Sequence, residues 1–254
     1  MKQLILIFCV FGTVFSQANR QLINGLDASI HSYPYMAGIY TNSVFTCGGA
    51  IINFRSILTA AHCILSHPQD ITVSVGGGRL NGQDGSLLRV SHTFMHPDYR
   101  GIHTAIVADI AVIRTLFPIA FTTRVRPISL GSSFPVSANE RVTITGWGLT
   151  GTDDNSDLAQ SLQTLEMSTI SNNVCASLHQ NTMARGWITS EKICTVGIQN
   201  NQQNSGICAG DSGGPLVVRN TVVGVASWTI RPCGTYPSVF IRTSNHLRWI
   251  RDNL

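Results

Sequence analysis

The chain has 254 residues and a formal net charge of +4, from 17 Lys and Arg against 13 Asp and Glu. Hydrophobic residues make up 43% and charged residues only 12%, which excludes a disordered chain, a coiled coil and a charge-repelled tail. The basic residues are scattered singly, so the charge gives no support to a nucleic-acid partner.

The N-terminus has the pattern of a secretory signal peptide. Lys2 precedes an apolar run from Leu4 to Val14, and Val14-Phe15-Ser16 supplies a cleavage site. Such a run is too short to span a bilayer as a helix but has the length of a signal-peptide core. We therefore expect residues 1–16 to be removed and the rest to be secreted and extracellular, with no membrane partner. The alternative is a buried N-terminal strand.

The cysteine content agrees with secretion. The chain has seven cysteines, and without Cys9 of the signal segment an even set remains: Cys47, Cys63, Cys175, Cys194, Cys208 and Cys233. Six cysteines in a secreted chain predict three disulfides, for which fifteen pairings are possible. No Cys-x-x-Cys pair occurs, so we expect no structural zinc site, and we expect no metal or cofactor.

The rest of the chain is predicted to be all-β. Short β-branched runs, separated by Gly, Asn, Ser and Pro clusters, occur at 50–52, 71–75, 141–145 and 221–227. Many short strands with turn signals between them favour a sandwich or barrel. One helix is predicted at about 244–254, with Ser244 as its N-cap and Leu247, Ile250 and Leu254 on one face.

Three motifs carry residues suited to catalysis, and they follow one another along the chain. His62 lies in TAAHC at 59–63, Asp109 begins DIAVI at 109–113, and Ser212 lies in GDSGGP at 210–215. Alone, each has an ordinary structural interpretation: a core histidine, a carboxylate that begins a strand, and a turn before a strand. The order His, Asp, Ser, however, is that of one known serine nucleophile triad.

With these motifs the sequence resembles the chymotrypsin-like, or trypsin-fold, serine peptidase family, and most of all its arthropod chymotrypsin, elastase and collagenolytic members. The matching motifs, in family order, are Cys47-Gly-Gly, TAAHC, DIAVI, GWG at 146–148, GDSGGP and Ser227-Trp228. The resemblance implies one peptidase domain over 22–254 with two six-stranded antiparallel β-barrels and a C-terminal helix. The N-terminal barrel would cover about 22–135, the C-terminal barrel about 136–243 and the helix about 244–254. It also implies the disulfides Cys47–Cys63, Cys175–Cys194 and Cys208–Cys233.

The resemblance assigns a role to each catalytic residue. Ser212 would attack a peptide carbonyl, His62 would accept its proton, and Asp109 would orient the imidazole. The N–H groups of Gly210 and Ser212 would form the oxyanion hole, and Ser227 would support Asp109. The chain would be a secreted serine endopeptidase made as a zymogen.

The resemblance also places the substrate. Gly206 would lie at the base of the primary specificity pocket, with Thr229 and Ser238 in its walls, and the backbone from Ser227 through Trp228 to Thr229 would pair with the substrate. Without a carboxylate at Gly206, a buried Lys or Arg side chain would have no partner. We therefore expect cleavage after Leu, Ala, Met, Phe or Tyr, with chymotrypsin-like and elastase-like behaviour both open.

Activation in this family implies a free N-terminus at Leu22, whose ammonium group would pair with Asp211. The propeptide would then be residues 17–21. Gln21 stands where the family usually has Arg or Lys. Three alternatives stay open: an activator that is not trypsin-like, a second trimming step, or inefficient activation.

We expect the chain to be a monomer. Its expected partners are protein or peptide substrates, an activating peptidase and protein protease inhibitors. Calcium binding is not expected, because Asp84 is the one carboxylate at 76–88. The alternative function is a catalytically silent family member that acts as a secreted binding or decoy protein. Digestive, salivary and parasitic roles stay open.

Overall fold

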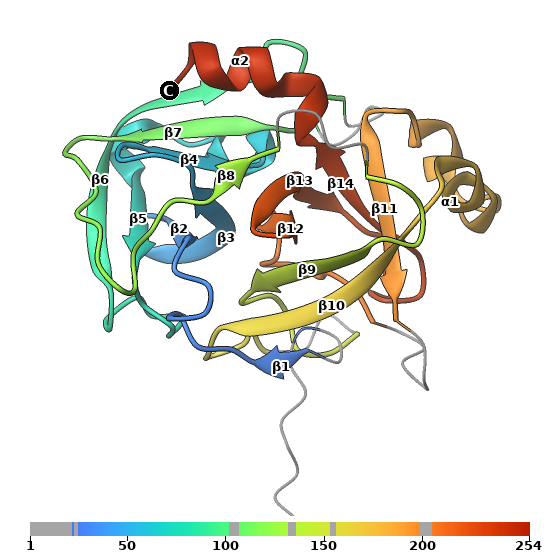
Figure 1. The fold of residues 1–254 in the computed structure, drawn as a ribbon, viewed down its shortest axis with the longest axis horizontal. Helices are drawn as coiled ribbons and strands as arrows, with labels where there is room; N and C mark the ends of the chain where they lie inside the picture. The colour runs from blue at the N-terminus through green and yellow to red at the C-terminus, as the bar shows by residue number, and fades with distance from the viewer. Residues whose placement is uncertain (1–21, 23–24, 102–106, 132–135, 153–155, 199–204) are drawn as a thin grey trace, which may run out of the picture.

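Two closed six-stranded antiparallel barrels lie side by side (Figure 1). The computed structural model describes residues 22, 25–101, 107–131, 136–152, 156–198 and 205–254. The predicted signal peptide at 1–16 and propeptide at 17–21 lie outside the described residues. The two-barrel fold and the short C-terminal helix predicted from the sequence are therefore confirmed.

The first barrel has the strand order β2-β3-β4-β7-β6-β5 and closes by the pairing of β2 with β5. Asn42 and Ser43 join β2 to β3 with φ of 50° and 67°, the backbone of a tight hairpin turn. The strands are β2 (Met36–Thr41), β3 (Val44–Ile51), β4 (Ser56–Thr59), β5 (Ile71–Val75), β6 (Ser86–Met95) and β7 (Ala111–Thr115).

The second barrel has the order β10-β11-β14-β13-β12-β9 and closes by the pairing of β9 with β10. Two short strands that precede β9 in the chain attach to it: β1 (Leu26–Asp27) pairs with β10, and β8 (Ser129–Leu130) pairs in parallel with β13. The barrel strands are β9 (Arg141–Gly146), β10 (Gln163–Ile170), β11 (Lys192–Gly197), β12 (Pro215–Val218), β13 (Thr221–Trp228) and β14 (Ser238–Arg242).

Strand alternation divides the hydrophobic core into two main clusters. Ala226 of β13 and Phe240 of β14 point into the second barrel. Their neighbours Val225 and Ile241 belong instead to the large cluster that fills the first barrel and the contact between the barrels. Because successive side chains in a strand point to opposite faces, one face of β13 and β14 lines the second barrel while the other packs toward the first.

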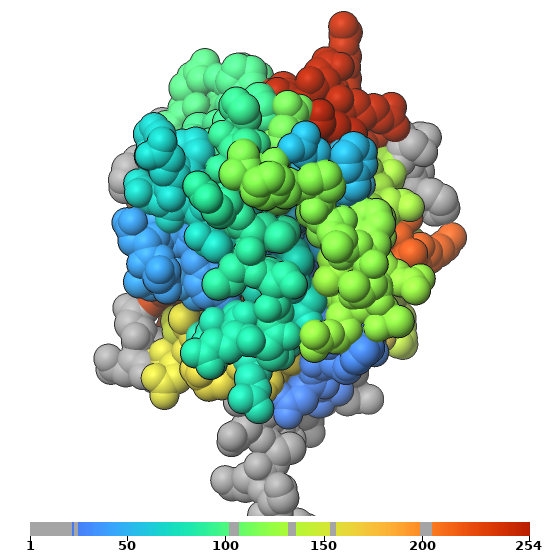
Figure 2. Space-filling view, turned by 90° about the vertical axis from the view of Figure 1, so that its left-hand side faces the viewer, coloured from blue at the N-terminus to red at the C-terminus, as the bar shows by residue number. Residues whose placement is uncertain are grey.

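The chain ends in a helical segment that crosses to the first barrel. A 3-10 turn, η4 (Thr243–His246), leads into α2 (Leu247–Asp252), and Figure 2 shows this red segment lying against the first barrel. Leu247 and Ile250 are buried as predicted. The prediction was wrong for Ser244, because the turn already begins at Thr243, and for Leu254, which is 41% exposed.

The other helical elements are short. Ser171 caps α1 (Asn172–Leu178) by accepting a hydrogen bond from the Val174 N–H. Three further 3-10 turns are η1 (Ala61–Ile64), η2 (Pro68–Asp70) and η3 (Met183–Trp187). In the described part of the chain, every helix is too short to cross a membrane. The disulfides join Cys47 to Cys63, Cys175 to Cys194 and Cys208 to Cys233, the pairing that the resemblance implies.

Candidate active site

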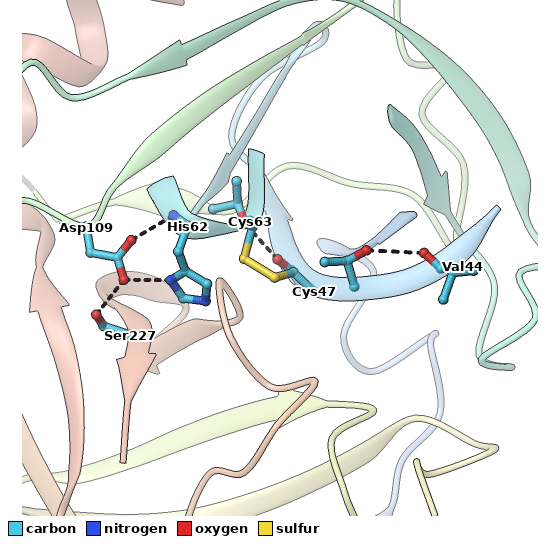
Figure 3. Close-up of a disulfide and its surroundings, with 9 residues drawn as sticks. Val44, Cys47, His62, Cys63, Asp109 and Ser227 are labelled. Atoms are coloured by element: carbon cyan, nitrogen blue, oxygen red, sulfur yellow. Dashed lines mark hydrogen bonds and ion pairs between the residues drawn. A yellow bond between two sulfur atoms is a disulfide. The ribbon is translucent and has the colours of Figure 1, made fainter. Parts of the chain in front are cut away.

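His62 is held in a short turn between the barrels. It lies in η1, where its neighbours Ala61 and Cys63 are buried and Cys63 is bonded to Cys47 of β3. Its backbone N–H donates to Oδ1 of Asp109 at 3.0 Å, and its ring Nδ1 lies 2.8 Å from Oδ2 of the same carboxylate (Figure 3). A carboxylate at Nδ1 favours the proton on that nitrogen, which leaves Nε2 of the neutral ring as an acceptor.

Asp109 is a fully buried carboxylate that receives three hydrogen bonds. Besides the two from His62, the hydroxyl of Ser227 donates to Oδ2 at 2.6 Å (Figure 3). Asp109 directly follows Ala108, whose φ is 48°, and lies shortly before β7 of the first barrel, whereas Ser227 belongs to β13 of the second. Buried charge is tolerated only with such partners, so the three residues hold one another in place.

Ser212 lies on a loop that is wedged between the barrels. Its carbonyl accepts a hydrogen bond from the Gly48 N–H of β3 at 2.8 Å, and the next residue, Gly213, donates to Ala226 O of β13 at 2.8 Å. Gly213 has a φ of +76°, and a Cβ there would lie 2.2 Å from Thr59 Oγ1. The loop therefore needs glycine at position 213. The Ser212 residue is partly accessible to solvent.

Two N–H groups of this loop are available to a ligand. Within the described residues, the N–H groups of Gly210 and Ser212 donate no hydrogen bond. Gly210 has a φ of +94°, and a Cβ there would lie 2.7 Å from Leu158 Cδ2. Backbone donors that are held rigidly and left unpaired can stabilise an oxyanion.

Asp211, next to Ser212, is a second fully buried carboxylate. It accepts hydrogen bonds from the N–H groups of Gly148 and Cys208, both at 2.9 Å. Burial raises the pKa of Asp211 to about 7 from the ordinary 3.8, against the effect of these two donors. A Cβ on Gly148 would lie 2.3 Å from the Asp211 carboxyl carbon, which explains the second glycine of GWG. The sequence alone identifies this motif but does not connect it with Asp211.

Leu22, the predicted mature N-terminus, is fully buried in the second barrel. Its side chain belongs to the cluster that contains Val142, Ile144, Leu216 and Phe240. The side chain is thus packed in the same barrel whose strand β12 follows the Ser212 loop.

The predicted pocket residues Gly206 and Ser238 contact each other. Ser238 is buried, and its Oγ accepts the N–H of Ile207 at 3.0 Å. A Cβ on Gly206 would lie 2.7 Å from that oxygen, so the hydroxyl fills the space beside the glycine. Thr229 directly follows β13 and is half-buried. The polar group at the predicted pocket base is therefore a hydroxyl.

Aromatic side chains pack around Trp228, in a cluster that no sequence motif indicates. His179 at the end of α1 is buried and stacks on Tyr236, with ring centroids 5.3 Å apart. Trp228 contacts both His179 and Trp187, with ring centroids 5.5 Å and 5.8 Å away. Burial lowers the pKa of His179, so the ring is neutral at neutral pH.

One group of side chains has atoms close enough to suggest a metal site. Cys47, His62 and Cys63 place one ligand atom each within 4.8 Å of the others. The two sulfur atoms form a disulfide, however, and metal ligation by cysteine requires a thiolate. This group therefore does not have the chemistry of a metal site.

Comparison with known proteins gives consistent matches over the whole folded region. The family model described as Trypsin matches residues 22–250. Chymotrypsin-2 of Vespa crabro is 32% identical, covering 91% of this chain and 99% of the relative. Trypsin iota of Drosophila melanogaster is 34% identical, with 92% and 88% covered. Kallikrein-12 of Homo sapiens is 30% identical, with 98% and 96% covered.

A solved structure gives the same match at the level of the fold. It is that of neuropsin, described as a serine protease expressed in the limbic system of mouse brain. The two structures superpose with a TM-score of 0.79 at 28% identity, covering 90% of this chain and 98% of the other.

Proposed function

Because this chain belongs to the trypsin family of serine proteases, we propose that it is a secreted endopeptidase, made as a zymogen, with Ser212, His62 and Asp109 as its catalytic residues. The observation that supports this most directly is the pair of hydrogen bonds from His62 to Asp109 beside the Ser212 loop. Members of this family act on protein substrates.

The proposed reaction is acyl transfer in two steps. Ser212 attacks the peptide carbonyl while Nε2 of His62 removes its proton, and His62 then returns that proton to the leaving amine. Asp109 holds the ring in the required tautomer and stabilises the imidazolium that forms. The free N–H groups of Gly210 and Ser212 would bind the oxyanion, and losing one such donor typically costs roughly 100- to 1,000-fold in rate. Water then hydrolyses the acyl-enzyme.

The proposed substrate preference is for small to medium apolar or aromatic residues before the scissile bond. The hydroxyl of Ser238 beside Gly206 would make the base of the pocket shallow and uncharged. A buried Lys or Arg would have no carboxylate partner there, which is costly. Backbone groups from Ser227 to Thr229 would pair with the substrate as an added strand.

Activation would begin with cleavage before Leu22. Asp211 is buried with two neutral N–H donors, and a carboxylate in that setting gains from a nearby cation. The new ammonium group of Leu22 would supply the cation and order the loop that carries Gly210 and Ser212. Since Gln21 precedes Leu22, the identity of the activating peptidase stays a separate question.

The test is an activity assay on the chain made to begin at Leu22. A panel of peptide anilides would differ only in the residue before the scissile bond. We expect cleavage after Leu, Ala or Phe, none after Arg, and loss of activity in Ser212→Ala. Covalent labelling of Ser212 by a fluorophosphonate is the second measurement. A folded chain that neither cleaves nor reacts would favour the alternative of a silent binding or decoy protein.

A further inference from the structure

A buried histidine contacts both segments that carry the predicted pocket walls. His179 follows α1 as its C-cap and is fully buried. Its ring stacks on Tyr236, with centroids 5.3 Å apart and planes 14° from parallel, and its centroid lies 5.5 Å from that of Trp228. Trp228 directly precedes Thr229 of one wall, and Tyr236 comes two residues before Ser238 of the other. One imidazole ring therefore packs against both segments.

The backbone of His179 is fixed independently of these ring contacts. Its N–H donates to Cys175 O at 3.1 Å, and its carbonyl accepts the Thr182 hydroxyl at 2.8 Å. The disulfide between Cys175 and Cys194 ties α1 to β11, against which it lies (Figure 1). Since α1 is anchored in this way, a change at the His179 ring acts on the neighbouring rings rather than on the helix.

Packing rather than hydrogen bonding holds these side chains together. Within the described residues, neither ring nitrogen of His179 has a hydrogen-bond partner, and the same holds for Trp228 Nε1 and Thr229 Oγ1. Trp228 also packs on Trp187, with ring centroids 5.8 Å apart. A neutral imidazole can occupy such a site as an aromatic ring. An imidazolium carries two N–H donors and a charge, and burying these without partners costs far more.

The surroundings of His179 do not favour a positive charge on its ring. Burial lowers the pKa of His179 below its ordinary 6.5. The Pro237 carbonyl opposes that shift, without a hydrogen bond of ordinary geometry to the ring. Tyr236 is the titratable side chain in ring contact with it. The charged residues of the neighbouring elements are not among the causes of the shift: Arg185 of η3, Glu191 and Lys192 at the start of β11, and Arg231 after β13.

We propose that His179 is a pH-sensitive positioning residue: its neutral ring holds the two pocket walls in the arrangement that binds the substrate side chain, and protonation displaces them. A charged ring is favoured where water reaches it, so acid shifts the population toward an arrangement in which the contacts with Tyr236 and Trp228 are broken. The substrate binds the intact arrangement, so substrate and proton oppose each other. Affinity is therefore complete at neutral pH and falls in acid. This inference rests on the proposed function, because the walls are those of the pocket proposed above.

The test is the binding of a peptide anilide, with Leu before the scissile bond, to the chain that begins at Leu22. A Ser212→Ala background prevents turnover, so the dissociation constant is measured without the chemical step. We expect this constant to rise about tenfold between neutral pH and about pH 5. By linkage, the bound peptide should weaken proton binding to His179 by the same factor, which NMR titration of its ring proton measures.

His179→Phe removes the titration but keeps an aromatic ring. Since neither ring nitrogen of His179 is hydrogen-bonded, the variant loses no such bond, and the tenfold rise should be absent. Titration of His62 affects both chains alike, so the ratio of their dissociation constants isolates His179. His179→Gln is a second variant without titration, used because the larger Phe ring can strain a packed site. It should show no rise either.

His31→Gln is the matched control. His31 is exposed, and its side chain makes no ring contact within the described residues. The tenfold rise should therefore remain in this variant.

The outcomes are distinguishable. An equal rise in His179→Phe and His179→Gln, or none in the chain that keeps His179, would overturn the role of His179. Weaker binding of the two variants by one factor at every pH would show packing alone and would overturn it too. In each case cleavage by the chain with Ser212 still supports the proposed function. A chain with Ser212 that neither cleaves peptides nor reacts with a fluorophosphonate would instead contradict the proposed function itself.

Discussion

The hydroxyl of Ser227 donates a 2.6 Å hydrogen bond to Oδ2 of Asp109, and this bond joins the two barrels at the centre of the site. The same oxygen lies 2.8 Å from Nδ1 of His62. Since a buried carboxylate is costly without its donors, the orientation of the His62 ring depends on how β13 of the second barrel docks against the first. Neither barrel alone supplies the complete set of partners.

Removing the Ser227 hydroxyl should therefore slow the reaction. In Ser227→Ala, Asp109 keeps its two hydrogen bonds from His62 but loses the third. We expect kcat/KM to fall about tenfold, the effect of one lost hydrogen bond to a charged group. Steady-state kinetics on the chain that begins at Leu22 is the measurement.

Ser56→Ala is the matched control for that variant. Ser56 on β4 is also fully buried, but its Oγ has no hydrogen-bond partner among the described residues. Activity in this control should stay unchanged. Equal kinetics in the Ser227 and Ser56 variants would show that the hydroxyl of Ser227 does not support Asp109.

Substituting Gly213 should unfold or disable the Ser212 loop. A Cβ in Gly213→Ala would lie 2.2 Å from Thr59 Oγ1 and 2.5 Å from Gly48 O, at a φ that side chains rarely adopt. We expect the free energy of unfolding to fall by about 3 kcal/mol, from backbone strain and overpacking together. Gly186→Ala, where a Cβ meets nothing within 4 Å, should have little effect. Denaturant unfolding of both variants provides the comparison, and equal stabilities would contradict the packing described.

Local sequence patterns predicted the strands well where alternation and β-branching coincide. The run at 71–75 is β5 with the same bounds, and 221–227 is all but the last residue of β13. Local sequence patterns do not predict an element boundary that is set by contacts with distant segments of the chain. Ser244 was expected to cap the last helix, but Thr243 begins the turn and donates to Val222 O across the barrel.

The candidate site shows the same limit. His62, Asp109 and Ser212 were predicted from three motifs, because the order of those motifs carries the chemistry. The need for glycine at 148 comes from the carboxyl group of Asp211, 63 residues away, which no local pattern shows. Lys192 begins its strand, where an exposed lysine is usual, yet it is only 1% exposed in the fold, which the local sequence does not indicate.

Ser238 should set how deep the specificity pocket is. Removing its hydroxyl in Ser238→Gly opens the space beside Gly206, so larger side chains should fit better. We expect the ratio of kcat/KM for Phe over Ala anilides to rise about tenfold. Ser238→Thr adds a methyl group and should lower that ratio. The Gly variant also leaves Ile207 N–H without its acceptor, so its stability is measured separately. Equal ratios in both variants would show that Ser238 does not line the pocket.

Asp211 should make the stability of the precursor depend on pH. Burial raises its pKa to about 7, so the folded chain binds this proton more tightly than the unfolded chain does. The protonated carboxyl therefore adds up to about 4 kcal/mol to the free energy of unfolding. This stabilisation is complete below about pH 4 and is lost as the pH rises through about 7. Urea unfolding of the precursor across this range, in a Ser212→Ala background that prevents self-cleavage, measures it.

Asp211→Asn isolates the contribution of this one carboxyl group. Asn has the same shape without the titration, so the difference in unfolding free energy between precursor and variant should vary between pH 4 and 8. Asp252→Asn changes an exposed carboxyl group. The difference in unfolding free energy between the precursor and this variant should therefore change little with pH. In the chain that begins at Leu22, the new ammonium group would hold Asp211 ionised, so the loss of stability with rising pH should disappear. A precursor and a mature chain with the same pH dependence would mean that the Leu22 ammonium does not reach Asp211, and activation would need another explanation.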